Sequence, residues 1–424
     1  MNSAKRNSLT TESIVTAKNR NILARTFTSV VFYRNYRLLW MGSWTEHLGE
    51  WMETTALLWL LNQMTHSPFL GTLLVTLRYL PMAVFAFIGG IVADRLNRRL
   101  LLIYALSASA VLSLTLAALV HAGFVRPWYL LVYSALSGIV TSFNHPARNT
   151  LVPNLVEKEH YLNAITLDNA SVTASRIIGA PLAGFIIGMA GTTPVLGMRG
   201  VGALLAIFWL SWLRAPATPR DAKKNTPLSN LVEGIHYVGE NRAVLTQVLL
   251  YLLPFFITNA YTGLLPYFAT DNLHIGPDLY GILNAAPGAG ALLATFTLAA
   301  LANLRRRGLI LLLGGIAQGA GLIFFAFSSF YPLSLFLLVF VGAANTVFMT
   351  LNNTTIQEMI TDQMRGRVMS LREVSMGLGP SGSLISGGIA GILGVPSALG
   401  VTGGIAIVVL LSIIIALPWT WQRG

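Results

Sequence analysis

The sequence predicts an all-α membrane protein with twelve transmembrane helices in two pseudo-symmetric six-helix bundles. The 424 residues are 54% hydrophobic and only 10% charged, whereas soluble globular chains carry roughly 25% charged residues. Twelve segments are apolar enough to cross a bilayer as helices, which takes about 20 residues each. The longest polar interruption, 214–242, leaves six of these segments on either side.

The predicted spans are separated by short breaks at proline, glycine and charged clusters. The first half contains 38–62, 69–92, 99–122, 128–151, 162–190 and 196–213. The second half contains 244–268, 279–301, 308–328, 331–355, 367–394 and 396–417. The predicted organisation is therefore a cytoplasmic N-terminal tail (1–36), a first bundle (37–213), a cytoplasmic linker (214–243), a second bundle (244–417) and a cytoplasmic C-terminal tail (418–424). Within the linker, 231–238 are expected to form a short amphipathic helix.

The basic residues set the expected orientation, because short loops rich in Lys and Arg stay in the cytoplasm. Of the 28 Lys and Arg residues, we expect Arg126 and Arg199 in outer loops and Arg78 and Arg176 within spans. The others, Arg148 among them, fall on the inner side, together with both termini. The net charge of +12 is then a consequence of membrane topology, and nucleic acid is not an expected partner.

A repeat relates the two halves. Four glycines of the fifth span recur 203 residues later in the eleventh, where Gly179, Gly184, Gly188 and Gly191 align with Gly382, Gly387, Gly391 and Gly394. Duplicated halves in parallel orientation are typical of transporters that work by alternating access, with a binding site between the halves near the bilayer midplane.

The segment after the second span resembles the G-x-x-x-D-R-x-x-R-R signature of the major facilitator superfamily. It reads Gly90-Ile-Val-Ala-Asp94-Arg95-Leu-Asn-Arg98-Arg99. Other stretches resemble the bacterial efflux-type branch, which includes enterobactin and macrolide exporters. Together they cover nearly the whole chain: 35–40, 51–52, 67–68, 144–148, 151–153, 233–237 and 365–371. The resemblance implies the major facilitator fold, a multi-pass position in the bacterial inner membrane, and substrates of the drug, macrolide or siderophore class.

Two motifs are candidates for gating. Asp94 can pair with cations or cap a neighbouring helix in one conformation and not in the other, although the arginines around it also serve topology. A second motif resembles the glycine/proline motif of the superfamily's antiporters, and ordinary packing of small residues is an equally good interpretation of it. The candidate gating residues are Gly90, Asp94, Arg95, Arg98, Arg99, Gly179, Pro181 and Gly184.

The first span carries an acidic stripe. Glu46, Glu50 and Glu53 are spaced i, i+4, i+7, which places them on one side of a helix. One charged side chain at the bilayer centre costs about 2.5–3.5 kcal/mol on insertion scales. The stripe is therefore expected to face the bundle interior or a water-filled cavity.

Crowded, desolvated carboxylates favour the protonated form, so this stripe is a candidate for proton coupling. His47 is a second possible proton carrier, and Arg78 and Arg176 are the expected counter-ions. The proton-coupling candidates are thus Glu46, His47, Glu50, Glu53, Arg78 and Arg176. Among them, Glu50 and Glu53 are expected to form the protonation-linked site facing the central cavity, with Glu46 and His47 assisting. The alternative is a structural ion-pair network among the three glutamates and Arg78 that fixes helix packing.

Several polar residues fall at the depth expected for a substrate cavity. They are Asn144, Asn259, Tyr261, Asn284, Asn345, Asn352 and Asn353. Buried amides also serve hydrogen bonding between helices, so the sequence does not decide between these two roles.

These features predict a secondary active transporter that exports amphipathic small molecules by alternating access, with proton-coupled antiport. A lysophospholipid-type transporter or flippase and a nutrient importer are the alternatives. The sequence contains no phosphate-binding loop and no zinc-protease motif, so we expect no enzymatic activity, cofactor or metal. The expected partners are a small-molecule substrate, protons and membrane lipids, and the expected oligomeric state is a monomer.

Overall fold

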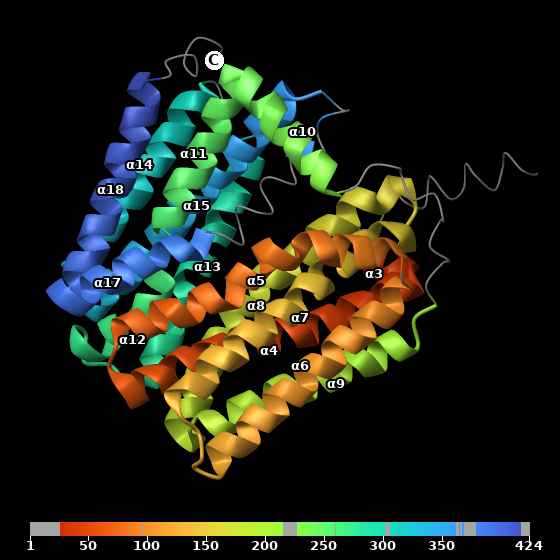
Figure 1. The fold of residues 1–424 in the computed structure, drawn as a ribbon, viewed down its shortest axis with the longest axis horizontal. Helices are drawn as coiled ribbons and strands as arrows, with labels where there is room; N and C mark the ends of the chain where they lie inside the picture. The colour runs from red at the N-terminus through yellow and green to blue at the C-terminus, as the bar shows by residue number, and fades with distance from the viewer. Residues whose placement is uncertain are drawn as a thin grey trace, which may run out of the picture.

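The computed structural model contains two groups of long helices (Figure 1). It describes residues 26–95, 97–214, 227–258, 260–301, 306–361, 364, 367–368 and 379–416. The first group follows the short helix α3 (Thr28–Phe32). Its members are α4 (Arg34–Thr65), α5 (Pro68–Arg95), α6 (Arg98–His121), α7 (Pro127–Leu151), α8 (Tyr161–Ala190) and α9 (Thr192–Ser211), with η1 (Val152–Leu155) and η2 (Lys158–His160) between α7 and α8.

The second group follows the linker, in which the expected amphipathic helix is present as α10 (Pro227–Glu240). Its members are α11 (Arg242–Thr258), α12 (Tyr261–Asp271), α13 (Pro277–Ala300), α14 (Arg307–Ala326), α15 (Tyr331–Met359), η3 (Gly379–Gly382), α17 (Ser383–Leu393) and α18 (Val395–Ala416). α11 and α12 lie along the seventh predicted span. Seven of the described helices are long and apolar enough to cross a membrane.

Local sequence explains where several helices begin and end. Proline occupies the start of α5, α7 and α13, where its missing N–H costs no helical hydrogen bond. Asn97 caps α6 by accepting from the backbone N–H of Arg99 at 3.0 Å. Gly191 and Gly394 directly follow α8 and α17 with φ of 77° and 83°, a conformation that glycine adopts without steric cost.

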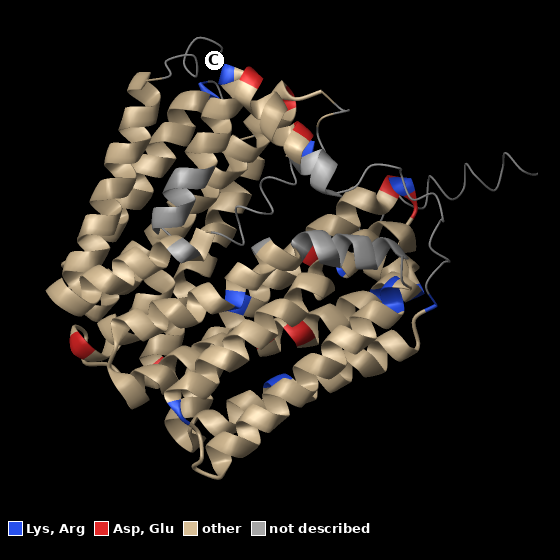
Figure 2. Ribbon diagram, in the orientation of Figure 1, with Lys and Arg blue, Asp and Glu red and all other residues tan. Residues whose placement is uncertain are grey.

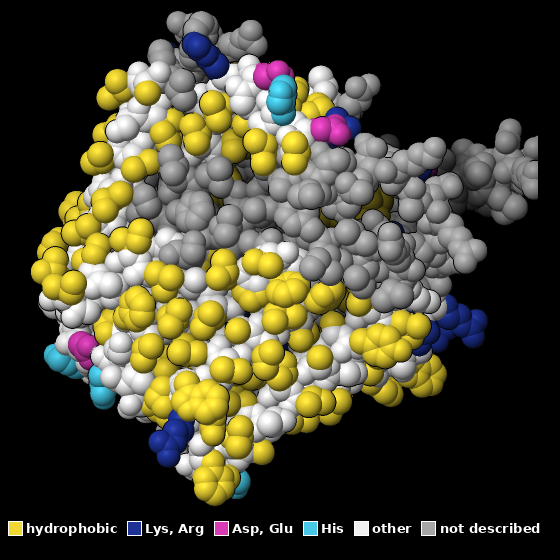
Figure 3. All heavy atoms as spheres, viewed as in Figure 1, with side chains coloured by type: hydrophobic (Ala, Val, Ile, Leu, Met, Phe, Trp, Pro, Cys, Tyr) yellow, Lys and Arg dark blue, Asp and Glu magenta, His cyan; other side chains and the backbone are white. Residues whose placement is uncertain are grey.

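The outer surface is apolar over a wide area (Figure 3). Large exposed side chains include Phe208, Phe296, Phe324, Phe336 and Ile415. Soluble monomers rarely expose contiguous apolar patches of more than a few hundred Å². This surface therefore suits contact with lipid.

In the described part of the chain, the main packing between the two halves lies at the end where they converge in Figure 1. The largest buried cluster draws on both halves, with Leu57 and Leu74 from the first and Tyr261 and Tyr280 from the second. At the opposite end, the buried clusters of the described residues each belong to a single half. We call the contact of α4, α5 and α8 with α12, α13 and α17 the seam.

Pseudo-symmetry is visible in the seam. Gly184 of α8 lies so close to α13 that an added Cβ would collide with the carbonyl oxygen of Pro277. Its repeat partner, Gly387 of α17, faces Thr72 of α5 just as closely. Each glycine thus meets the second long helix of the other half, as a duplicated fold requires.

Candidate functional site

Charged residues are distributed unequally between the halves (Figure 2). In the second half, the described charged residues lie at or beyond helix ends. The first half contains a group of contacting ionisable side chains inside its helices, which we call the ionic network. Its members are Glu46, His47, Glu50 and Glu53 on α4, Arg78 on α5, Arg148 on α7, Asp168 on α8 and Arg199 on α9.

Glu53 is held between two guanidinium groups. Its side chain is 0% exposed, with Oε1 2.7 Å from Nη1 of Arg78 and Oε2 2.9 Å from Nε of Arg199. A buried charge is tolerated only when it is paired and hydrogen-bonded. Glu53 meets that condition with both oxygens.

Small residues bring α9 close enough for this contact. A Cβ on Gly49 of α4 would lie 3.2 Å from Cδ of Arg199, and one on Gly202 of α9 would lie 3.0 Å from the carbonyl oxygen of Thr45. Because neither position carries a side chain, the stem of Arg199 lies along α4 and its guanidinium reaches Glu53.

Glu50 is less tightly held. Its Oε1 lies 3.2 Å from Nη2 of Arg78 and its Oε2 lies 3.6 Å from Nδ1 of His47. With 22% of its side chain exposed, it is the most accessible carboxylate of the ionic network. Of the four acidic groups, Glu50 therefore has the most contact with solvent.

Arg148 connects the remaining members. Its Nη2 donates to Asp168 at 2.7 Å, and its Nη1 contacts His47 Nε2 and lies 4.0 Å from Glu46. Glu46 also accepts from the amide of Asn144 at 2.5 Å. Because a guanidinium only donates hydrogen bonds, His47 Nε2 is the acceptor in its contact with Arg148.

The ionic network has one more carboxylate than it has guanidinium groups. Four carboxylates face three guanidinium groups, so with all seven groups ionised their formal charges leave an excess of one negative charge. The side chains of this network come from five helices, so their contacts tie α4 to α5, α7, α8 and α9.

Three arginines differ from expectation. The prediction that Arg199 lies in an outer loop is wrong, because it is buried within α9 and paired with Glu53. Arg148 is likewise buried in α7 instead of lying in an inner loop. Arg176 lies over the ring of Trp51, 4.6 Å from its centroid. Among the described carboxylates, none is within ion-pair distance of Arg176, so it is not the counter-ion that the sequence suggested.

Sequence reasoning did not identify Arg148, Asp168 and Arg199 as partners of the stripe. The available signal for Asp168 was a carboxylate inside a predicted span, which marks a functional or paired residue. For Arg199 the signal was its position inside the predicted span 196–213. Neither signal indicates which helices become neighbours.

The candidate cavity residues do not gather into one site. Asn144 belongs to the surroundings of Glu46, while Asn284 donates across the seam to Thr55 at 3.1 Å. Tyr261 is buried where the halves meet. The other amides contact neighbours within the second half: Asn345 with Gln318, Asn352 with Gln247 and Asn353 with Gln357. Asn259 lies outside the described residues.

The candidate gating residues fall into two places. Gly90, Asp94 and Arg95 lie at the end of α5, where side chains are outside the described part. Arg98 donates to the carbonyl oxygen of Thr150 at 3.3 Å. Arg99 donates to the carbonyl oxygens of Leu210 and Ser211 at 2.9 and 2.5 Å, so it is a cation at the C-terminus of α9, where the helix dipole favours it.

The second gating motif, on α8, lies against other helices. Gly179 contacts Leu48 and Trp51 of α4, and Pro181 and Gly184 contact Gly281 of α13.

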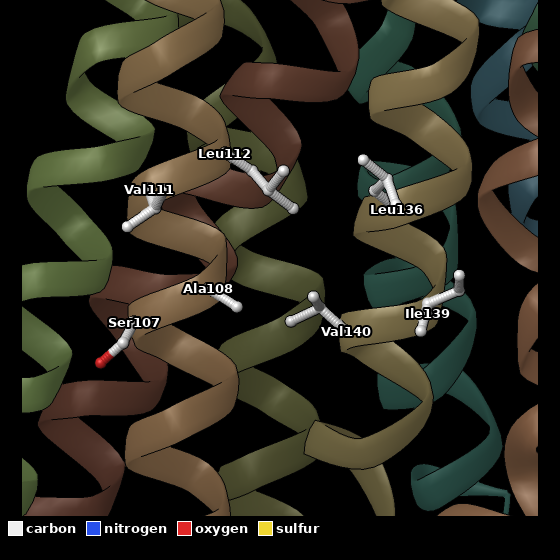
Figure 4. Close-up of a pocket in the computed structure, with 7 residues that line it drawn as sticks. All are labelled: Ser107, Ala108, Val111, Leu112, Leu136, Ile139 and Val140. Atoms are coloured by element: carbon white, nitrogen blue, oxygen red, sulfur yellow. The ribbon is translucent and has the colours of Figure 1, made fainter.

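A separate groove of about 420 Å³ lies between α6 and α7 (Figure 4). Its lining is Ser107, Ala108, Val111, Leu112, Leu136, Ile139 and Val140. The hydroxyl of Ser107 already donates to the carbonyl oxygen of Ile103 at 2.8 Å. The groove therefore offers an apolar surface without a charged group, unlike the ionic network.

Comparison with known proteins agrees with this architecture. The sequence matches the family described as transmembrane secretion effectors over residues 28–422. It is 22% identical to a staphyloferrin A transporter of Staphylococcus aureus, over 88% of this chain and 92% of that protein. It is 23% identical to macrolide efflux protein A of Streptococcus pyogenes, over 86% and 92% of the two chains. With an enterobactin exporter of Shigella boydii it shares 26% identity over 78% and 80% of the chains.

Solved structures show the same fold at low sequence identity. A POT family transporter in complex with 5-aminolevulinic acid superposes with a TM-score of 0.74 at 11% identity, covering 92% of this chain and 97% of that one. The nucleoside transporter NupG gives a TM-score of 0.70 at 15% identity, covering 92% and 100%. The chain therefore belongs to the transmembrane secretion effector family of the major facilitator superfamily and is a multi-pass transporter of small molecules.

Proposed function

We propose that this transporter is an exporter of amphipathic small molecules, of the drug, macrolide or siderophore class, and that it works by alternating access with proton antiport. The protein would move its substrate across the inner membrane without changing it chemically, and it would act as a monomer surrounded by lipid. The observation that carries the proposal is the excess negative charge of the ionic network, with its most accessible carboxylate on Glu50.

The packing of the halves supports a transport cycle. They are joined at the seam, and the buried clusters of described residues at the end that carries α3 and α10 each belong to one half. If the basic tail and linker lie in the cytoplasm, as the positive-inside rule predicts, this conformation is open toward the cytoplasm and ready to accept a substrate there.

Glu50 is our choice for the proton carrier, and Glu53 is the structural anchor. Glu53 is fully buried and bound by two arginines, so protonating it would leave those cations uncompensated. Protonating Glu50 removes the excess charge and frees Arg78 to interact with Glu53 alone. A change of this kind in the contact between α4 and α5 would alter helices that also form the seam.

Inside-out membrane vesicles with an acidic interior provide the test. A substrate that exchanges with protons releases them from the lumen, which a fluorescent pH dye reports. We expect proton release with at least one of a macrolide, a hydrophobic cationic dye or an iron-free siderophore. Glu50→Gln should abolish proton release, while Glu159→Gln, which changes an exposed carboxylate, should retain it.

Two outcomes would contradict the proposal. Proton release by Glu50→Gln at the wild-type rate would exclude Glu50 as the carrier. Movement of a lysophospholipid in the absence of any pH gradient, with no response to the three export substrates, would favour the flippase alternative.

A further inference from the structure

The seam contains buried polar atoms without hydrogen-bond partners. Trp59 of α4 and Tyr280 of α13 stack across it, with ring centroids 5.3 Å apart. Trp59 is 4% exposed and Tyr280 is 0% exposed. Neither the indole N–H nor the phenol hydroxyl finds a partner among the described residues.

The adjoining turn of α4 repeats this pattern. The amide nitrogen of Asn62 donates across the seam to the carbonyl oxygen of Pro266 at 3.3 Å and to the hydroxyl of Thr270 at 3.1 Å. Its amide oxygen is buried without a partner in the described structure. Two of these polar atoms, on Trp59 and Asn62, thus lie on adjoining turns of α4, and the third lies opposite them on Tyr280 of α13; all three are buried in the closed seam.

Such atoms oppose closure. A buried donor or acceptor that lacks a partner loses its hydration and gains nothing in return. When the halves part at the seam, the same atoms become accessible to water. The buried apolar residues of the joined end favour the closed form, and these polar atoms offset part of that preference.

We propose that Trp59 and Tyr280 form the gate at the joined end, and that their unpaired polar atoms keep the closed gate marginally stable, so that it opens in each transport cycle. This inference rests on the alternating access proposed above. In this proposal, Trp59 and Tyr280 set the equilibrium between the closed and open forms of the seam. Neither residue is a member of the ionic network.

The hydroxyl of Tyr280 can be removed without changing the ring. Tyr280→Phe abolishes the penalty that its buried hydroxyl imposes on the closed form and leaves the stacking on Trp59 in place. The desolvation cost of one such group corresponds to a shift of about 5-fold to 150-fold in the equilibrium toward the closed form.

The chain contains no cysteine, so a single introduced thiol reports opening. Thr55 of α4 is 0% exposed and contacts Asn284 across the seam. In purified Thr55→Cys protein, modification by a maleimide requires the seam to open. Its rate follows the population of the open form when opening and closing are fast relative to modification.

Tyr36→Phe is the matched control. Tyr36 is equally buried, but its hydroxyl donates to the carbonyl oxygen of Ala164 at 2.8 Å within the first half. We expect Tyr280→Phe to slow modification of Thr55→Cys by about 5-fold to 150-fold and to raise the unfolding temperature. Tyr36→Phe should leave the modification rate unchanged and lower the unfolding temperature.

An unchanged or faster modification rate in Tyr280→Phe would overturn the inference. The experiment uses neither a substrate nor a pH gradient. A failure of proton-coupled export would therefore appear in the vesicle assay alone, and a failure of the gate would appear in the modification rates alone.

Discussion

Glu53→Gln is expected to be the most destabilising conservative substitution in the ionic network. It keeps the size of the side chain but removes the negative charge that faces Arg78 at 2.7 Å and Arg199 at 2.9 Å. Removing one partner of a buried ion pair costs about 3–5 kcal/mol, because the other charge stays buried without compensation. At about 2–4 °C per kcal/mol for a unit of 150–250 residues, the unfolding temperature of the first half should fall by about 6–20 °C.

Thermal unfolding in neutral detergent, followed by tryptophan fluorescence, measures this change. The double variant Glu53→Gln with Arg199→Gln should recover part of the loss, since it removes one of the two uncompensated cations. Glu50→Gln should cost less, because Glu50 is partly exposed and has one guanidinium contact, at 3.2 Å. If Glu53→Gln unfolds at the wild-type temperature, the assignment of Glu53 as the anchor is wrong.

Three further predictions follow from contacts on other helices. Asp168→Asn removes one negative charge from the ionic network, so the network should bind a proton more weakly. The pH profile of proton release in vesicles should then move to lower pH, and an unchanged profile would show that Asp168 takes no part in proton coupling. Gly184→Val places a side chain against the carbonyl oxygen of Pro277, so it should hold the seam open and speed the modification of Thr55→Cys. Slower modification would contradict the close contact between α8 and α13. Arg99→Gln loses two hydrogen bonds to the end of α9 and should lower stability by about 0.3–1 kcal/mol, measured by thermal unfolding, whereas Arg99→Lys should retain part of the effect.

The long helices could be predicted from composition because a helix that crosses the bilayer needs about 20 predominantly apolar residues. The predicted span 128–151 corresponds to α7 (Pro127–Leu151), and 162–190 corresponds to α8 (Tyr161–Ala190). The seventh span was less accurate, since 244–268 is two helices, α11 and α12. Proline, glycine and charge mark the ends of spans but do not show how a span is divided.

The acidic residues of the site could be predicted from the sequence, but their partners could not. The spacing of Glu46, Glu50 and Glu53 required an interior position, and the structure gives all three polar partners there. The identity of those partners depends on which helices become neighbours. Arg199 is 146 residues from Glu53 in the chain, and it reaches Glu53 only because Gly49 and Gly202 allow α4 and α9 to approach. Arg176 had the right charge and depth, but its helix places it over Trp51.

The confinement of buried charge to the first half has a consequence for how such a duplicated protein can diversify. The described interior of the second half is free of Asp, Glu, Lys, Arg and His, so substitutions along α13, α14 and α15 do not disturb a balance of opposite charges. Substitutions that change the substrate should then cost the least stability in that half, while α4 and its charged neighbours stay constrained. Under the proposed mechanism, a chimera that joins this first half to the second half of a relative should take its proton coupling from this chain and its substrate selectivity largely from the relative.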